Sequence, residues 1–331
     1  MKASAIAHAN IALVKYWGKR DNGLMLPHNG SISMTTDDFA AHTTVEFGVP
    51  EDVLVLNGTQ LGKGTEEYDE YVGNFLAALR EMTGRRERVK IVSKNDFPTA
   101  AGLASSAAGF AALATAVNEA LGLNLDQQAL SVLARRGSGS ATRSIYGGFV
   151  EWLRGSNQDG RDSIALQIAP PSHWPAFRMI ACITSFQAKK VKSRAGMSQT
   201  VKTSALYKGW LDSVKHDLDA VRSGIQSRDF SLVGRTAEEN CLKMHATMMT
   251  TRPPIIYWNA GTLELIHSIL DWRDEGLECY FTIDAGPQVK IMCLSKDAEE
   301  IMKRAKEFPG IEDVRLARPG PDARVVREHL F

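Results

Sequence analysis

Residues 98–107 combine small side chains, one glycine and two serines in a way that suits phosphate binding. They read P-T-A-A-G-L-A-S-S-A and lead directly into an alanine-rich stretch that we expect to be helical. The first turn of a helix has N–H groups without intrahelical partners and carries the positive end of the helix dipole, so it attracts anions. Gly102 and the alanines leave room, while Ser105 and Ser106 can donate to phosphate oxygens or reach Mg²⁺. The same pattern also fits an ordinary, closely packed helix start.

Two better-known phosphate motifs are missing from the chain. The nearest approach to a Walker A loop, residues 58–64, has the wrong spacing and places a glycine after Lys63. The Rossmann pattern G-x-G-x-x-G fails because Gly137 and Gly139 are followed by Thr142 at the third position. A nicotinamide-dependent dehydrogenase is therefore disfavoured.

Composition indicates a soluble globular protein of 331 residues, with 44% hydrophobic and 23% charged residues. No apolar run is long enough to cross a bilayer, and a formal charge of +1 argues against nucleic-acid binding as the main purpose. The cysteines are widely separated and form no C-x-x-C pair, which favours reduced thiols over a zinc site or disulfides: Cys182, Cys241, Cys279 and Cys293. The N-terminus lacks a secretion signal, so we expect a cytoplasmic protein that needs no membrane. The histidines, including His8 and His245, show no metal-binding spacing.

Hydrophobic periodicity predicts alternating strands and helices, then a change to longer helices. In the first half we expect strands at 43–47, 53–56 and 89–93, and helices at 66–82, 102–121 and 127–135, the last ended by Gly137. An Asn57-Gly58 turn follows the second of these strands. In the second half we expect strands at 179–183, 279–283, 289–294 and 314–317, and helices at 205–225, 232–248, 260–275 and 298–308. This order indicates an α+β arrangement with a boundary near 175–190.

Four further segments concentrate polar and charged residues in apolar or small-residue settings. They are A-H-A-N-I-A-L-V-K-Y-W-G-K (7–19), G-S-G-S-A-T-R-S (137–144), A-K-K-V-K-S-R-A-G-M (188–197) and T-I-D-A-G-P (282–287). With the phosphate loop, these segments resemble the GHMP kinase superfamily and, within it, the mevalonate diphosphate decarboxylases. The resemblance runs nearly end to end.

The resemblance implies a fold of class α+β, the GHMP kinase fold. Residues 1–180 would form the N-terminal ATP-binding α/β domain and residues 181–331 a ferredoxin-like α+β domain, with the active site in the cleft between them. It also implies the reaction: mevalonate 5-diphosphate and ATP give isopentenyl diphosphate, ADP, phosphate and CO₂. A homodimer is the implied assembly, although no interface is recognisable in the sequence.

The resemblance further implies catalytic roles for Asp284, Lys15 and Arg143. Asp284 ends an apolar strand beside a turn, where it could simply cap the turn; in the family's role it orients a tertiary alcohol toward the γ-phosphorus and takes its proton. Arg143 would hold the substrate carboxylate with paired hydrogen bonds, and Lys15 would keep Asp284 ionised. Taken singly, both cations would more often be exposed surface charges.

The remaining expected site residues fall into two groups. The substrate-binding residues that match the family are Tyr16, Lys19, Ser138, Ser140, Arg143, Ser193 and Arg194. The ATP and phosphate site comprises Pro98, Ala101, Gly102, Leu103, Ala104, Ser105, Ser106 and Lys190. Lys190 belongs to a basic stretch, residues 185–196, that alone reads as a solvated loop; the resemblance implies that this lid segment closes on ATP. Mg²⁺ is expected with ATP, held by phosphates, water and hydroxyls such as that of Ser106.

One segment departs from the expected family pattern. Leu26 to Ser33 has a histidine at position 28, where the family usually has an apolar residue or threonine, and a glycine at position 30, where a polar residue is usual. Because this region lies near the phosphate-bearing end of the substrate, mevalonate 5-phosphate stays open as a second candidate substrate. The sequence also leaves open a mevalonate 3-kinase and a catalytically silent ligand-sensing protein; intact Asp284, Lys15 and Arg143 argue against the silent protein.

Overall fold

The computed structural model describes residues 1–65, 68–96, 105–187 and 189–331. Within these ranges, two β-sheets form the framework, and a short pairing of β2 (Lys19–Asp21) with β3 (Leu26–Pro27) lies apart from both. The first sheet has the order β14-β1-β4-β7-β5-β6, with β8 and β9 continuing from β4. The second has the order β11-β12-β10-β13. Among these described strands, all pairs are antiparallel except β5 with β7.

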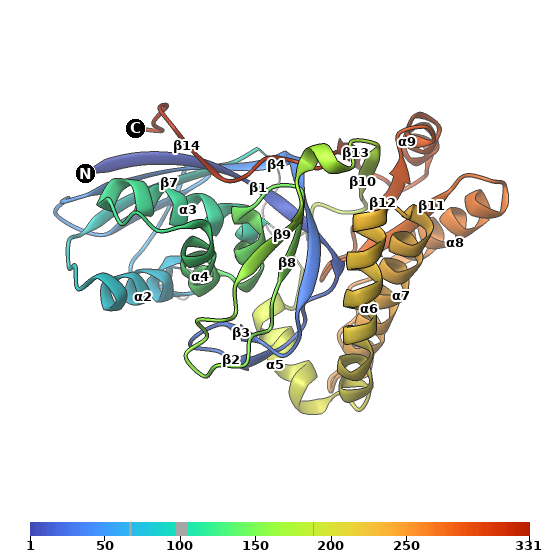
Figure 1. Cartoon of the computed structure of the whole chain (residues 1–331), viewed down its shortest axis with the longest axis horizontal. Helices are drawn as coiled ribbons and strands as arrows, with labels where there is room; N and C mark the ends of the chain where they lie inside the picture. The colour runs from blue at the N-terminus through green and yellow to red at the C-terminus, as the bar shows by residue number, and fades with distance from the viewer. Residues whose placement is uncertain (66–67, 97–104, 188) are drawn as a thin grey trace.

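The first sheet contains most of the first half of the chain and one strand from the end. Its strands are β1 (Lys2–Val14), β4 (Ser31–Phe47), β5 (Val53–Leu56), β6 (Thr59–Leu61), β7 (Val89–Asn95), β8 (Phe149–Trp152), β9 (Ala165–Ala169) and β14 (Arg324–Val326). Helices α2 (Asn74–Thr83), α3 (Ser105–Leu121) and α4 (Gln127–Gly137) gather on one side of this sheet (Figure 1). Helix α3 packs on β1 and β4 through a nearly continuous run of buried alanines, so helix and sheet approach closely.

The second sheet and the remaining helices make up most of the second half of the chain. Its strands are β10 (Phe177–Ile183), β11 (Cys279–Ile283), β12 (Val289–Leu294) and β13 (Asp313–Ala317); the helices are α5 (Ser193–Thr203), α6 (Tyr207–Ser227), α7 (Phe230–Met249), α8 (Ala260–Asp274) and α9 (Ala298–Glu307). One face of the sheet packs with α8 and α9 around Phe281 and Ile291. On the opposite face Tyr280 packs against Phe230 of α7, in the core shared with the first sheet. Helix α7 also contacts β1, which joins the two halves.

Most predicted elements are present. The strands β5, β11 and β12 have the predicted bounds, and the Asn57-Gly58 turn joins β5 to β6 with both residues at positive φ. The helix predicted over 66–82 is described only from its later part, as a π-helical segment (Asp69–Gly73) followed by α2. The predicted end of the helix at Gly137 is confirmed: Gly137 is the last residue of α4, and Ser138 is the C-cap. A Cβ at Gly137 would lie 2.0 Å from Phe110, so the glycine is needed for close packing.

Strand β1 was not predicted, although its pairing with β4 is the longest among the described strands. Strand β1 reads K-A-S-A-I-A-H-A-N-I-A-L-V and is buried along almost its whole length. Its alanines have low strand propensity, and burial on both faces removes the usual alternation of polar and apolar residues. Strand β14 pairs with β1, with Ser4 opposite Val326. Among the described helices, none has the length and apolar character needed to cross a membrane.

Candidate active site

A large cleft brings together the polar segments singled out in the sequence. It has about 1790 Å³ of empty space, open solvent at its mouth included. It is lined by the end of β1, the start of α3, the 3₁₀ segment Gly139–Ile145, the start of α5 and the end of β11. All the expected substrate-binding residues line it: Tyr16, Lys19, Ser138, Ser140, Arg143, Ser193 and Arg194. Asp284, Lys15, Ser105 and Ser106 line it as well.

Asp284 follows the last residue of β11, and two ammonium groups contact its carboxylate. Lys15 Nζ, just beyond β1, donates to Oδ1 at 2.7 Å, and Lys290 Nζ, on β12, lies 3.3 Å from Oδ2. Both lysine side chains are 1% exposed, whereas that of Asp284 is 24% exposed toward the cleft. Burial alone would raise the pKa of Asp284, but the charges and hydrogen bonds of Lys15 and Lys290 outweigh it and hold the pKa well below its usual range. The carboxylate is therefore an anion at neutral pH.

The structure supports Lys15 from several sides. Its Nζ also donates to the carbonyl of Ala12 at 2.9 Å. Its backbone N–H donates to Oδ1 of Asn240, a fully buried residue of α7, at 2.8 Å. Asn240 in turn donates to Asp217 of α6 at 2.7 Å. The position of Lys15 is thus fixed by helices of the second half as well as by its own strand.

Arg143 lies in the 3₁₀ segment and is 2% exposed. Its Nε donates to Asn10 Oδ1 at 3.1 Å and to Ser33 Oγ at 2.9 Å, Nη2 donates to Asn10 Oδ1 at 3.0 Å, and Nη1 donates to Ser31 Oγ. Burial lowers the pKa of Arg143 to about 10, although the charge of Asp284 opposes this, so the guanidinium stays charged at neutral pH. In the described part of the chain the second cation in ion-pair contact with Asp284 is Lys290 rather than Arg143.

Sequence reasoning missed Lys290. It stands in the strand V-K-I-M-C-L, where a lone lysine reads as the outward-facing member of an alternating pattern. Its distance of six residues from Asp284 along the chain was the available signal, because two adjacent antiparallel strands joined by a short loop bring such residues together. Lys290 is paired across the ladder with Thr282.

Two lysines of the lid segment line the cleft, Lys189 and Lys192, and neither is the predicted Lys190. Lys189 lines the cleft and donates from Nζ to Ser193 Oγ at 2.7 Å and to the carbonyl of Ala285 at 2.9 Å. Burial lowers the pKa of Lys189 to about 8, with Asp284 opposing the shift and Lys290 adding to it. Lys190 is exposed and does not line the cleft.

The far wall of the cleft has basic and hydroxyl groups. Arg194 donates from Nη2 to the carbonyl of Gly137 at 2.6 Å, and Ser138 Oγ lies 3.3 Å from both Ser140 Oγ and Ser106 Oγ. Burial, with the nearby charge of Arg194, lowers the pKa of Lys19 to about 8. This wall is therefore positively charged at neutral pH and suits an anionic ligand.

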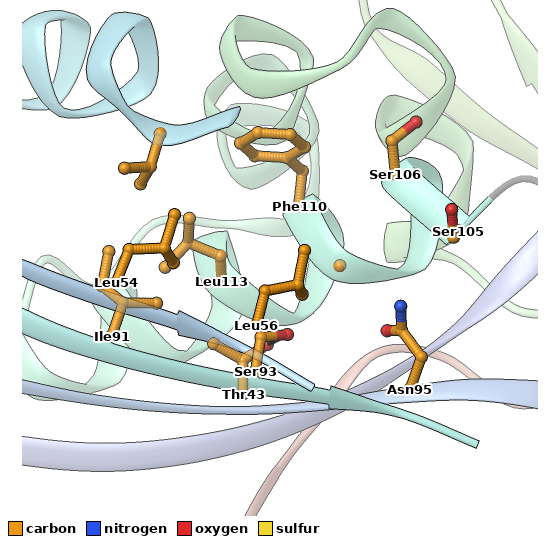
Figure 2. Close-up of a pocket in the computed structure, with 12 residues that line it drawn as sticks. Thr43, Leu54, Leu56, Ile91, Ser93, Asn95, Ser105, Ser106, Phe110 and Leu113 are labelled. Carbon is orange, nitrogen blue, oxygen red and sulfur yellow. Dashed lines mark hydrogen bonds between the residues drawn. The ribbon is translucent and has the colours of Figure 1, made fainter. Parts of the chain in front are cut away.

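The start of α3 borders the cleft and a second, more apolar pocket. Five predicted phosphate-loop residues lie outside the described residues: Pro98, Ala101, Gly102, Leu103 and Ala104. Ser105 and Ser106 line both cavities. In Figure 2, Asn95 lies below Ser105 at one end of the second pocket, and Leu54, Ile91 and the other apolar side chains fill the opposite end. A flat apolar ring with a polar edge would fit this combination.

Within the described ranges, no three His, Cys, Asp or Glu side chains gather as a metal site. The oxygen donors that the cleft offers at α3 are the hydroxyls of Ser105 and Ser106. His245 is buried against Trp258, and burial lowers its pKa to about 3, so it is neutral. All four cysteines are buried and free. The two serine hydroxyls at α3 suit a divalent cation that arrives with its own phosphate ligands.

Two α+β halves, a cleft between their sheets and a serine-bearing helix start at that cleft define the GHMP kinase fold predicted from the sequence. The family model described as "Diphosphomevalonate decarboxylase-like N-terminal domain" matches residues 7–165, and that of the "Mevalonate 5-diphosphate decarboxylase C-terminal domain" matches residues 179–321. The chain therefore belongs to the diphosphomevalonate decarboxylase family.

Individual relatives agree with the family models. Diphosphomevalonate decarboxylase of Ganoderma lucidum is 37% identical, over 95% of this chain and 84% of its own. A structure described as "MDDEF in complex with MVAPP, AMPPCP and Magnesium" is 42% identical, with a TM-score of 0.91 over 98% of this chain and 99% of that one. Mevalonate diphosphate decarboxylase from Staphylococcus aureus is 38% identical, with a TM-score of 0.92 over 98% of each chain.

Proposed function

We propose that Asp284 is the catalytic carboxylate of an ATP-dependent decarboxylation of mevalonate 5-diphosphate. The chain converts this substrate and ATP to isopentenyl diphosphate, ADP, phosphate and CO₂. The observation that supports the role of Asp284 is its carboxylate, held as an anion by Lys15 and Lys290 at one end of a cleft whose other wall is basic. An ionised carboxylate within reach of a tertiary hydroxyl orients its O–H and accepts its proton.

The reaction proceeds in two stages. First the tertiary hydroxyl oxygen attacks the γ-phosphorus, its proton passes to Asp284, and the bond from the γ-phosphorus to the ADP oxygen breaks. The new 3-phosphate then leaves with the electron pair of its C–O bond. The bond from the neighbouring carbon to the carboxylate breaks, CO₂ departs, and that electron pair forms the double bond of isopentenyl diphosphate. The protein contributes chiefly positioning and electrostatic stabilisation.

Arg143 and the basic wall hold the substrate. Arg143 binds its carboxylate, because a guanidinium fixed by Asn10, Ser31 and Ser33 is already oriented before the substrate arrives. The diphosphate lies near Tyr16, Lys19, Ser140, Ser193 and Arg194, with Ser138 beside them. The positive charge of this wall supports this orientation of the substrate.

We assign ATP binding to the start of helix α3. Its phosphates lie at the start of α3 beside Ser105 and Ser106, and its base occupies the second pocket, where Ser93 and Asn95 supply polar groups (Figure 2). We assign the phosphate contact of the lid segment to Lys189 in place of the predicted Lys190, because Lys189 is held at the cleft by Ser193; Lys192 also lines the cleft. Mg²⁺, when bound with the nucleotide, offsets the charge of the phosphate oxygens, and Ser106 is the side chain suited to contact it.

Product analysis tests the reaction and the identity of the substrate together. ADP and CO₂ are measured in parallel reactions with mevalonate 5-diphosphate and mevalonate 5-phosphate. We expect both products in equal amounts, and faster release from the diphosphate. ADP without CO₂ would indicate a 3-kinase, faster reaction of the monophosphate would reverse the substrate preference, and neither product would indicate a binding protein.

Three further predictions accompany this function. We propose a homodimer, and a cytoplasmic location in keeping with the four free thiols. We also keep the division into an ATP-binding domain and a ferredoxin-like domain, predicted at residue 180. The separate second sheet supports two domains, and its strand β10 already begins at Phe177. Strand β14 lies with the first of these domains in space.

A further inference from the structure

Lys290 is an unusual residue for its place in the fold. It is 1% exposed and is the second residue of β12, whose other residues are all apolar. Burying an ammonium group is costly unless an opposite charge and hydrogen bonds compensate for it. Lys290 forms an ion pair with the carboxylate of Asp284. A lysine that served only to fill space here would be better replaced by an apolar side chain, as at the neighbouring positions.

The two lysines contact different oxygens of the carboxylate. Lys15 binds Oδ1 from the end of β1, and Lys290 faces Oδ2 from β12. The terminal torsion of an aspartate side chain has a broad energy profile, so one cation on one oxygen leaves the plane of the carboxylate free to turn. A second cation on the other oxygen restricts this turning. Each carboxylate oxygen can accept two hydrogen bonds, so one lysine on an oxygen does not exclude a substrate hydroxyl from the same oxygen.

We propose that Lys290 is a positioning residue for the decarboxylation: it fixes the plane of the Asp284 carboxylate and keeps that group ionised. This inference rests on the proposed role of Asp284 as the catalytic carboxylate. It assigns separate tasks to the two lysines, because Lys15 also ties the end of β1 to the site through Ala12 and Asn240, whereas Lys290 ties the carboxylate to the second sheet.

The charged and titratable groups around Asp284 determine which pH change would report on it. They come from five parts of the fold: Lys15, Arg143, Lys189, Lys290, and Cys241 with His245 on α7. Burial lowers the pKa of His245 to about 3 and raises that of Cys241 to about 11, so neither changes charge in the ordinary working range. Lys189, with a pKa of about 8, titrates on the alkaline side. The phosphates of the substrates also take up protons on acidification, but they are the same for every variant. A difference between the acid limbs of a Lys290 variant and the wild type therefore reports the protonation of Asp284.

The sign of the expected shift follows from the charges. Lys15 and Lys290 both depress the pKa of Asp284, so the wild-type carboxylate remains ionised far into the acid range. Without Lys290 the pKa of Asp284 rises, and a larger fraction is protonated at any given acidic pH. A protonated carboxyl cannot accept the proton of the hydroxyl. The acid limb of kcat/KM must then move to higher pH.

The experiment compares pH profiles of Lys290 variants. Lys290→Met should lower kcat roughly 10- to 100-fold, in keeping with the cost of a small misplacement of a reacting group. Its KM values should change little, and its acid limb should move to higher pH. Lys290→Gln provides a second neutral variant if the methionine variant does not fold. Lys290→Arg, which retains the charge, should regain part of kcat and return the acid limb toward the wild-type position.

Arg273→Met is the matched control. Arg273 pairs with Glu238 at 2.7 Å and donates to the carbonyl of Cys279, so it supports the same second sheet from outside the cleft. Its loss should lower the melting temperature and leave the acid limb in place. A folded neutral Lys290 variant whose acid limb coincides with that of the wild type overturns the inference. If Asp284→Asn keeps wild-type kcat, the role of Asp284 fails instead, so the two failures are distinguishable.

Discussion

The catalytic end of the cleft and the lid segment hold their positive charges in different ways. At the catalytic end, Lys15 and Lys290 are almost fully buried and bound to Asp284 before any ligand arrives. In the lid segment, Lys190 and Lys192 are exposed, and only Lys189 of these three lysines is partly buried at the cleft. Charges that act on reacting atoms must be oriented in advance, because orienting them during the reaction would add to the barrier. Charges that capture a nucleotide can be recruited as the ligand binds.

The largest effect should come from replacing Asp284, the residue at the centre of the catalytic end of the cleft. Asp284→Asn keeps the size of the side chain and removes its negative charge, so kcat should fall by about 10²- to 10⁴-fold, the usual contribution of a general base. Affinity for an ATP analogue, measured by calorimetry, should change little, because the proposed site of the nucleotide phosphates is at α3. A parallel loss of nucleotide affinity would show that the two regions are not separate in function.

Arg143→Lys should have the next largest effect. The substitution keeps the charge but loses the planar fork that Asn10, Ser31 and Ser33 hold in place. We expect kcat to fall roughly 10- to 100-fold, from misorientation of the substrate carboxylate, with the KM for ATP unchanged. Steady-state kinetics with each substrate varied in turn would check this. A change confined to the KM for ATP would contradict the assignment.

The smallest effect should come from the lid segment, where paired variants sharpen the comparison. Lys189→Met should raise the KM for ATP about tenfold, the loss of one charge-assisted hydrogen bond of ~1.4 kcal/mol. Lys190→Met should stay within about twofold, as expected for an exposed charge. A larger rise in the KM for ATP in Lys190→Met than in Lys189→Met would instead identify Lys190 as the phosphate-binding lysine.

The pH dependence of ATP binding provides a second measurement on the same pair. Lys189 is positively charged below its pKa of about 8 and loses its charge as the pH rises through that value. The KM for ATP should therefore rise above about pH 8 in the wild type. This rise should be absent in Lys189→Met and preserved in Lys190→Met.

The sequence predicted those parts of the fold that local patterns encode. Strands β11 and β12 are short, mostly apolar runs bounded by turn residues, so their bounds could be predicted to the residue. Strand β1 could not be predicted, because its alanines favour helix in isolation and only pairing on both sides makes it a strand. Gly137 ends its helix as predicted. The sequence did not show why glycine is needed there: a side chain would collide with Phe110, a residue distant in sequence.

The site was predictable to the extent that its residues belong to recognisable segments. Asp284, Lys15 and Arg143 stand in such segments, and all three line one cleft. Lys290 was not predicted, since its burial and its contact with Asp284 depend on the pairing of β11 with β12. The choice between Lys189 and Lys190 also required the structure. Adjacent lysines in a loop give no periodic pattern that shows which one faces inward.

The pairing of β14 with β1 has a consequence for biosynthesis. Strand β1 is translated before β14, and Arg324–Val326, which pairs with residues 4–6 of β1, follows more than three hundred residues later. Throughout that interval the nascent chain carries an open β-edge able to pair with another polypeptide. Early translation products would therefore depend on chaperones to keep that edge from aggregating.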